Sequence, residues 1–291
     1  MGYVLATGNF DGWHLGHHSI YEEVNRIAKA KNLQPLMVSF APHTSHLLNN
    51  NARPLLLTTS QEKQDLFKEL KIPHQVLDFT KKMAGLDADV FIREVIIKKM
   101  RAKAWVFGAN HRFGRGGLGD FPFVKEKFPD MPVYQAPFTK YKGEMISSSR
   151  IRALLVNCDL DLANKMLGRA YSITGKVVKG FGRGAKIGFP TANLEVNVHK
   201  MLPGNGVYGG IAIIDGKKYR AVTNIGERPT FSGAGSAVEV HLIDDKLELY
   251  DKIIEMKLNL FIRREKKFAN VDELRMQIAR DVQYVQTKTV I

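Results

Sequence analysis

Residues 3–18 read YVLATGNFDGWHLGHH, and this stretch decides the fold of the first half of the chain. A short apolar run, YVLAT, leads into a glycine-containing loop, and a helical pattern follows with Ile20, Val24 and Ile27 on one side. A strand that passes through a loop into a helix is the repeating unit of a parallel sheet with crossover helices. Ligands bind beyond the carboxyl ends of the strands in such sheets, so the polar loop residues are candidates for a binding site.

The rest of the first half repeats this alternation. Helices are predicted at 19–31, 61–71 and 87–100, and further strands at 35–40, 75–79, 104–108 and 132–136. Ser60 precedes the second helix, and Lys63 stands where a capping box would have glutamate. The first half is therefore predicted to be an α/β domain with a parallel sheet.

The pattern changes after about Leu167. Strand-like, glycine-punctuated segments follow at 170–178, 207–214, 218–225, 237–243 and 253–261. They favour an antiparallel barrel or sandwich. Residues 271–285 close the chain as an amphipathic helix with Leu274, Ile278 and Val282 on one face. We expect two domains, residues 1–160 and 168–291.

Composition limits the classes of protein. The net charge of +14 suggests nucleic acid as a partner. The basic residues are spread along the chain without a block of five or six, so we expect no nucleic-acid partner. No apolar run approaches the roughly 20 residues of a membrane span, and no signal peptide precedes the first strand. Cys158 is the single cysteine, which excludes an internal disulfide and fits a reducing cytoplasm.

His14 and His17 are the first candidates for chemistry. Three residues apart on the first turn of a helix, they would share one face. A helix N-terminus offers unpaired N–H groups and a partial positive charge, so two imidazoles beside it suit a phosphate. Gly8 and Gly12 would let the backbone approach the ligand. An acid–base pair and a zinc site stay open, although zinc lacks a third ligand nearby. His18 is expected to face elsewhere.

Further polar segments follow later strands and should reach the same edge of the sheet. They are SFAPHT (39–44) with His43, GANHRFGRGG (108–117) with Asn110, Arg112 and Arg115, and ISSSRIR (146–152) with Arg150 and Arg152. The serines can cap a helix, and the arginines can pair with phosphate. No Walker lysine motif is present, so a P-loop site is excluded.

The second half carries its own candidate motif, GFGRGAKIGFPTANL (180–194). Thr191 and Asn193 would face the same way on an extended segment. A hydroxyl and an amide oxygen are hard ligands that suit Mg²⁺ with a nucleotide phosphate. The glycines would let phosphates lie against backbone N–H groups. The alternative is an ordinary glycine-rich turn.

These motifs resemble two known families in order along the chain. GNFDGWHLGH and ISSSRIR resemble the G-x-F-D-x-x-H-x-G-H and I-S-S-T-x-I-R signatures of the nucleotidyltransferase superfamily. With FAPH and GANHRFG, the first half looks like the Rossmann-like FMN adenylyltransferase module of bacterial FAD synthetases. PTAN, TNIGERPTF (223–231), AVEVHLI (237–243) and FIRREKKF (261–268) resemble the flavokinase domain, a six-stranded barrel that uses ATP and Mg²⁺. The resemblance runs from about Gly8 to Asp281.

The resemblance implies FAD biosynthesis in two steps. The second domain would phosphorylate riboflavin to FMN with ATP, and the first would transfer the adenylyl group of ATP to FMN, which gives FAD and pyrophosphate. Catalytic roles fall on His14, His17 and Glu239, with Glu239 as the base for the riboflavin 5′-hydroxyl. Nucleotide or phosphate binding falls on Gly8, Phe10, Asp11, Gly12, Gly16, Ser147, Ser148, Arg152, Gly182 and Gly184. Flavin binding falls on His43, Asn110, Arg112, Asn224 and Arg263, and metal binding on Asn110, Thr191 and Asn193.

Other functions stay open beside this one. The chain could retain a single activity, with adenylyl transfer the more expected of the two, or it could bind flavin without turnover. A basic nucleic-acid-binding regulator is a further alternative. We expect a cytoplasmic enzyme with ATP, riboflavin, FMN and FAD as partners, Mg²⁺ as cofactor and no membrane contact, and leave a homo-oligomer open.

Overall fold

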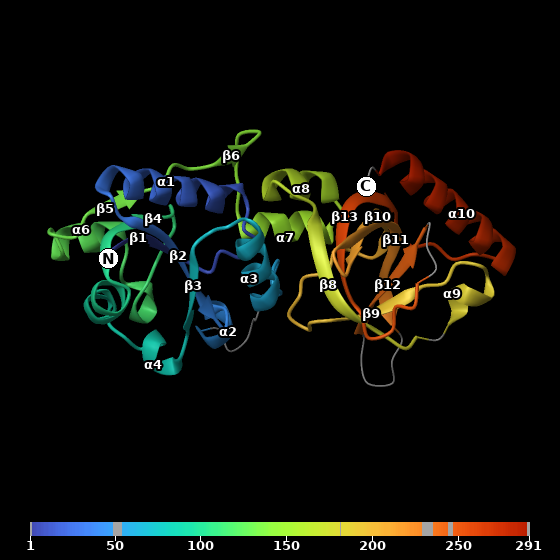
Figure 1. Cartoon of the computed structure of the whole chain (residues 1–291), viewed down its shortest axis with the longest axis horizontal. Helices are drawn as coiled ribbons and strands as arrows, with labels where there is room; N and C mark the ends of the chain where they lie inside the picture. The colour runs from blue at the N-terminus through green and yellow to red at the C-terminus, as the bar shows by residue number, and fades with distance from the viewer. Residues whose placement is uncertain (1, 49–53, 181, 229–234, 244–246, 290–291) are drawn as a thin grey trace. The chain divides into compact units, whose positions relative to one another are not determined.

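The computed structural model describes residues 2–48, 54–180, 182–228, 235–243 and 247–289. The chain divides into two compact units, Met1–Ser148 and Ser149–Ile291 (Figure 1). Phe181 and the end of the TNIGERPTF motif, residues 229–231, lie outside the described residues.

A five-stranded parallel sheet forms the centre of the first unit, which confirms the predicted α/β class. The strand order is β3-β2-β1-β4-β5, and the strands are β1 (Tyr3–Thr7), β2 (Gln34–Ala41), β3 (His74–Asp78), β4 (Ala102–Phe107) and β5 (Val133–Gln135). The order reverses between β1 and β4. The loops after these two strands therefore diverge, and a sheet of this type binds its ligand at that point.

Helices and one short hairpin complete the first unit. They are α1 (Leu15–Lys31), α2 (Thr44–Leu48), α3 (Ser60–Glu69), α4 (Lys81–Ala84), α5 (Ala88–Val90), η1 (Phe91–Lys99), η2 (Arg115–Gly117), α6 (Phe121–Lys127), and the strands β6 (Lys140–Tyr141) and β7 (Glu144–Met145). Helix η1 is a π-helix, and the N–H of Met100, which follows it, donates to the carbonyl of Val95 five residues earlier. Helix α1 begins at Leu15, earlier than the apolar pattern predicts, so His17 lies in its first turn.

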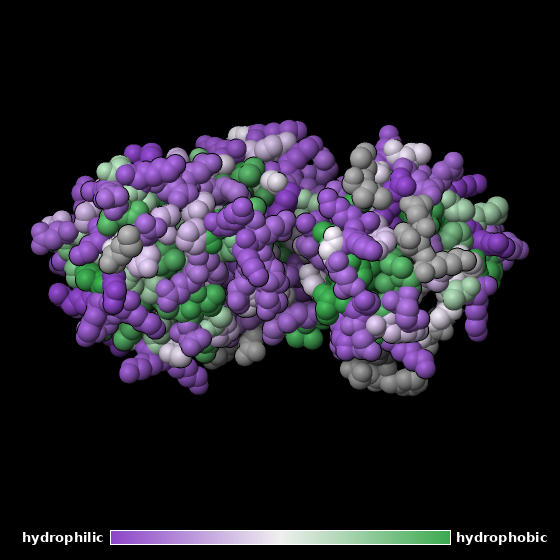
Figure 2. Space-filling model, in the orientation of Figure 1, coloured by the Kyte–Doolittle hydropathy of each residue, from purple (hydrophilic) through white to green (hydrophobic). Residues whose placement is uncertain are grey.

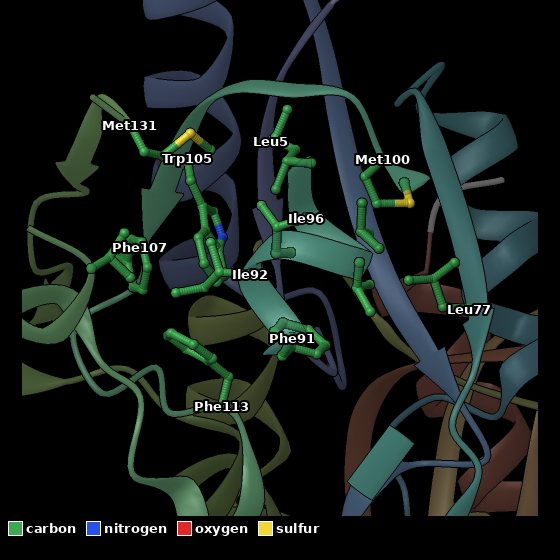
Figure 3. Close-up of a cluster of buried hydrophobic side chains, with 14 of the residues drawn as sticks. Leu5, Leu77, Phe91, Ile92, Ile96, Met100, Trp105, Phe107, Phe113 and Met131 are labelled. Atoms are coloured by element: carbon green, nitrogen blue, oxygen red, sulfur yellow. The ribbon is translucent and has the colours of Figure 1, made fainter. Parts of the chain in front are cut away.

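Hydrophobic side chains cover both faces of the sheet. One cluster joins Leu5 of β1 and Trp105 of β4 to helix η1, and its side chains gather closely in Figure 3. The other cluster joins Val4 of β1 to helix α1 and to Phe67 of α3. Successive strand residues point to opposite faces, so the two clusters lie on opposite sides of the sheet. A parallel sheet is stable only when both of its faces are covered in this way.

The start of helix α3 differs from the prediction. Thr59, and not Ser60, is the N-cap, so the predicted cap was wrong by one residue. The Thr59 hydroxyl accepts a bond from the Glu62 N–H, and the Glu62 carboxylate accepts one from the Thr59 N–H, which forms a complete capping box. Lys63 then belongs to the inward face of the helix and is only 6% exposed.

The second unit is a closed antiparallel barrel, which confirms the barrel alternative and the closing helix. Its strand order is β10-β11-β12-β9-β8-β13. The strands are β8 (Tyr171–Val178), β9 (Ala192–Val196), β10 (Gly206–Ile214), β11 (Lys217–Arg228), β12 (Gly235–Leu242) and β13 (Ile253–Arg263). The helices are α7 (Ser148–Val156), α8 (Leu160–Leu167), α9 (Arg183–Lys186) and α10 (Val271–Lys288).

Helices α8 and α10 both contact strands of the barrel. The Asn164 side chain of α8 donates to the Leu258 carbonyl and accepts from the Tyr171 N–H. In α10, Val285 packs against Val207 and Val222 of neighbouring strands. Helix α8 therefore belongs structurally to the barrel, although it precedes the first strand in the sequence.

The surface offers little continuous apolar area in the view drawn. Figure 2 shows hydrophilic residues over most of this face, with hydrophobic residues in small patches. Among the described residues, no helix combines the length and the apolar character that crossing a membrane requires.

Candidate active sites

The loop between β1 and α1 is held in shape by hydrogen bonds. The Asp11 carboxylate accepts from the backbone N–H groups of Leu57 (3.1 Å) and Thr58 (3.0 Å). The Thr58 hydroxyl accepts from the Gly12 N–H at 3.0 Å, and the Ser148 hydroxyl donates to the Asp11 carbonyl at 2.9 Å. Gly12 has a φ of +80°, which favours glycine. The Asp11 carboxylate is thus engaged inside the protein.

The two candidate histidines lie against each other at the start of α1. His14 is the N-cap residue, and its ring stacks on that of His17 with 3.6 Å between centroids and 19° between planes. A Cβ atom on Gly16 would lie 3.1 Å from the His14 ring, so the glycine makes room for it. The Phe10 ring meets His17 edge-on at 5.3 Å. The result is an imidazole pair beside a helix N-terminus, which suits an anionic ligand.

The His18 ring lies 5.3 Å from that of the fully buried Trp13, and the His17 ring lies 6.1 Å from the same side chain. Among the described residues, no group of three or more His, Cys, Asp or Glu side chains could hold a metal ion.

The loop after β4 meets the end of β1. A hydrogen bond of 2.9 Å joins the Thr7 hydroxyl to His111 Nε2. The His111 ring packs against the aromatic side chains of Trp105, Phe107 and Phe113, and its burial lowers the pKa of the imidazole to about 4. This histidine is therefore neutral at physiological pH, and it fixes the two loops at the point where the strand order reverses.

The other predicted residues of this loop are exposed. Asn110 lies at the turn, and Arg112 forms an ion pair with Asp120 at 2.7 Å. The guanidinium retains further N–H donors beyond those that the carboxylate takes.

The loop after β2 also joins the group. The Asn9 side chain donates to the Thr44 hydroxyl at 2.8 Å and accepts from the Thr44 N–H at 3.3 Å. His43 is half-buried beside it, and its Nδ1 is hydrogen-bonded to the Ser45 hydroxyl at 2.7 Å. The loops after β1, β2 and β4 and Ser148 are therefore linked at one edge of the sheet. Ser147 precedes Ser148, whereas Arg152 belongs to the second unit, one turn further along α7.

The barrel contains a cavity of about 380 Å³ at its glycine-rich loop, called cavity A here. Gly180, Gly182, Thr191 and Asn193 line it, and so does Tyr250. A Cβ atom on Gly180 would lie 2.0 Å from Asn193 Nδ2, so glycine is required if Asn193 keeps this position. Thr191 and Asn193 both line cavity A.

A second cavity of about 330 Å³, called cavity B, lies in the same unit. Its lining includes Gly184, Thr191, Asn224, Glu239 and Arg263. A Cβ atom on Gly184 would lie 2.3 Å from the Phe189 carbonyl oxygen and 3.1 Å from the Thr191 hydroxyl. Because Thr191 lines both cavities, a group bound in one lies next to a group bound in the other.

The strand register explains this arrangement. Glu239 of β12 pairs with Asn193 of β9 on one side and with Asn224 of β11 on the other. Three polar residues therefore form a row across adjacent strands, with the carboxylate in the middle. Glu239 is half-buried and lines cavity B. Its carboxylate can therefore reach a ligand in the cavity and, because it is partly exposed to solvent, can also exchange protons.

Residues that the sequence analysis did not nominate complete cavity B. Asp281 of α10 is 2% exposed, and its carboxylate accepts from Arg263 Nε and Nη2, the latter at 2.8 Å. Gln277 donates to the same carboxylate at 2.9 Å. A signal existed, because Asp281 follows Leu274 by seven residues and so interrupts the apolar face of the helix. His241 also lines this cavity, and its Nδ1 bonds to the Pro190 carbonyl at 2.8 Å.

Comparisons with known proteins agree for both units. A family model described as FAD synthetase matches residues 1–150, and one described as riboflavin kinase matches residues 167–289. A protein of Escherichia coli (strain K12) named bifunctional riboflavin kinase/FMN adenylyltransferase is 35% identical over 287 residues, which covers 96% of this chain and 90% of that protein. A Bacillus subtilis (strain 168) protein of the same name is 36% identical over 290 residues, with the same coverage.

One solved structure matches nearly the whole chain. It is described as a macrolide-efflux protein from Streptococcus pneumoniae, and it aligns with a TM-score of 0.89 at 29% identity. The alignment covers 98% of this chain and 94% of that one.

Proposed function

This chain belongs to the family of bifunctional riboflavin kinase/FMN adenylyltransferases, and from that premise we infer which of its residues perform each step. It makes FAD from riboflavin with ATP as co-substrate, by phosphorylation to FMN and then by adenylyl transfer to FMN. We assign adenylyl transfer to residues 1–160 and phosphorylation to residues 168–291.

Adenylyl transfer falls on the edge of the sheet where β1 and β4 diverge. An oxygen of the FMN phosphate attacks the α-phosphorus of ATP, and pyrophosphate leaves. His14 and His17 bind the triphosphate and stabilise the charge that develops on the leaving group, since fixed donors in a preformed site lower the barrier. The stacked imidazole pair at the N-terminus of α1 is the observation that carries this assignment.

The surrounding loop supports these histidines. Gly8, Gly12 and Gly16 bring backbone N–H groups close to the phosphates. Phe10 and Asp11 act inside the loop, because Phe10 packs under His17 and Asp11 is bonded to residues 57 and 58. We assign further phosphate contacts to Ser147, Ser148 and Arg152, and flavin contacts to His43, Asn110 and Arg112.

We assign phosphorylation to cavities A and B, which share Thr191 as a lining residue. We place the nucleotide in cavity A, with its phosphates along Gly182 and reaching Gly184 at the wall of cavity B, and the flavin in cavity B beside Asn224 and Arg263. Glu239 accepts the proton of the riboflavin 5′-hydroxyl as the hydroxyl oxygen attacks the γ-phosphorus of ATP, and ADP leaves with the bridging oxygen. General-base assistance of this kind contributes about 10²–10⁴-fold to the rate.

Mg²⁺ is the metal that these donors fit. Thr191 and Asn193 supply uncharged oxygen ligands in cavity A, and a Mg²⁺ ion commonly takes most of its remaining ligands from substrate phosphates and water. When bound, the ion neutralises charge on the transferred phosphoryl group. Asn110 is the corresponding amide in the first unit. A cytoplasmic location and a homo-oligomer stay predictions.

A product assay tests the assignment. The purified chain is given ATP and Mg²⁺ with riboflavin or with FMN, under oxidising and reducing conditions, and the flavins are separated by chromatography. We expect FMN and FAD from riboflavin, and FAD from FMN. If only one of the two conversions occurred, the chain would have a single activity. Tight flavin binding with neither product would contradict the proposal. A salt-dependent RNA complex as tight as the flavin complex would favour the nucleic-acid alternative.

A further inference from the structure

Lys63 is a buried lysine close to the proposed adenylyl-transfer site. It lies on α3, is 6% exposed, and its ammonium donates to the Asn9 carbonyl at 2.8 Å. Asn9 belongs to the loop between β1 and α1, the loop that ends at His14. Lysine is almost never fully buried without a partner, so this contact calls for a physical reason.

Lys63 interacts electrostatically with Asp11 and His74. Burial lowers the pKa of Lys63 to about 8, and the Asp11 carboxylate only partly offsets this effect. His74 of β3 is neutral at physiological pH, because burial and the Lys63 charge lower its pKa to about 4. It is joined to the Ser39 hydroxyl at 2.7 Å. The protein thus retains a lysine where an apolar residue would avoid the desolvation cost.

Residues 57–63 hold the loop from one side. Asp11 accepts two backbone bonds from residues 57 and 58, Gly12 donates to the Thr58 hydroxyl, and Lys63 donates to Asn9. The loop needs such support, because Phe10 and Trp13 have φ values of +47° and +39°. Non-glycine residues keep this conformation only where the surrounding structure enforces it. Of these contacts, the hydrogen bond from Lys63 to Asn9 lies nearest to the end of β1.

We propose that Lys63 is a positioning residue for adenylyl transfer, since its hydrogen bond to Asn9 sets the loop that ends at His14 and leads into α1, where His17 lies. The proposal rests on the function assigned above to the histidines. It predicts that loss of the ammonium lowers turnover without a matching loss of stability, because the desolvation cost that an apolar side chain avoids offsets the lost hydrogen bond.

The test uses substitutions in the full-length chain. Lys63→Met keeps the length and the apolar stem but removes the donor, and Lys63→Gln restores an uncharged N–H donor. Lys68→Met is the matched control, because Lys68 lies on the same helix and is exposed. Phosphorylation of riboflavin, which takes place in the other unit, reports whether the chain is intact. Thermal unfolding is followed at pH 7.

We expect kcat for FAD formation from FMN to fall at least about 30-fold in Lys63→Met, since a displacement of 1 Å in a catalytic group can cost about 10²-fold. Unfolding should occur at the wild-type temperature or above, kinase activity should stay within about twofold, and Lys63→Gln should recover at least about a fifth of the wild-type rate. Lys68→Met should behave as wild type.

Three results would overturn the inference. The first is a rate of FAD formation in Lys63→Met within about threefold of wild type. The second is an equal loss of this rate in Lys63→Met and Lys68→Met. The third is a loss of rate that accompanies a lowered unfolding temperature and that Lys63→Gln does not recover. A parallel His14→Asn variant separates this failure from that of the proposed function. If His14→Asn forms FAD normally, the site itself is misassigned. If it does not, and Lys63→Met does, only the role of Lys63 is wrong.

Discussion

Replacing Gly180 with alanine separates the proposed kinase site from general stability. The new Cβ atom would lie 2.0 Å from Nδ2 and 2.6 Å from Cγ of Asn193. Non-bonded carbon atoms prefer about 3.5–4.0 Å, so the Asn193 side chain must move by more than about 1 Å. Because the obstructing atoms are the end of a side chain, we expect a stability change of less than about 1 kcal/mol.

The effect on catalysis should be much larger. A misplacement of 1 Å in a substrate-positioning group can lower a rate by about 10²-fold, so kcat for riboflavin phosphorylation should fall by about that factor in Gly180→Ala. FAD formation from added FMN should not change, because we assign it to the other unit. Both rates are measured on the same preparation by chromatography of the flavins.

Gly216→Ala supplies the matched control. Gly216 lies at the turn between β10 and β11 with a φ of +77°, and a Cβ there would meet no atom within 4 Å. Alanine in this conformation costs about 1–2 kcal/mol, so this variant should lose stability and keep its kinase rate. The reasoning would be refuted if Gly180→Ala kept more than about a third of the wild-type kinase rate, or if it lost both activities together.

Three further predictions concern buried titratable groups. Asp281→Asn leaves the Arg263 guanidinium without its buried anion, so the second unit should lose about 3–5 kcal/mol, seen as an unfolding midpoint lowered by about 10 °C; an unchanged midpoint would contradict this. The pKa of His111 in the folded chain is lowered from 6.5 to about 4, so as the pH falls the unfolded chain binds the proton first, and the free energy of unfolding should fall by up to about 3 kcal/mol between pH 6.5 and 4. His111→Phe should flatten the plot of this free energy against pH over that range, and parallel plots for the two proteins would exclude the role of His111. The folded pKa of Lys63 is lowered from 10.5 to about 8, so wild-type stability should rise between these pH values, and denaturant unfolding of Lys63→Met should show no such rise.

Local sequence patterns predicted the elements and the two loops that carry the proposed sites. Strand–helix alternation predicted the parallel sheet, and the three-residue spacing of His14 and His17 predicted a shared face. The alternation of Thr191 and Asn193 predicted a shared wall, and both residues line cavity A. The two side-chain predictions depend on neighbours within one turn or one strand, and the sheet was predicted from the order of such local elements along the chain.

The parts that sequence patterns did not predict depend on distant partners. Lys63 and Asn9 are 54 residues apart, and Arg263 and Asp281 are 18 apart, so no local periodicity pairs them. The predicted capping residue of α3 was wrong by one position, and Lys63 faces inward because it precedes the buried Phe67 by four residues on the same helix face. Strand β9 was also missed by the apolar pattern, because its pairing with β8 and β12 only becomes visible when the barrel closes.

The central claim is that one chain carries two separate active sites, one around His14 and one around Glu239. The most direct measurement compares the products of His14→Asn and Glu239→Gln, each supplied with ATP, Mg²⁺ and either riboflavin or FMN. We predict that His14→Asn converts riboflavin to FMN and stops there, and that Glu239→Gln fails with riboflavin but converts added FMN to FAD. Loss of both activities in either variant, or wild-type products from both, would contradict the account.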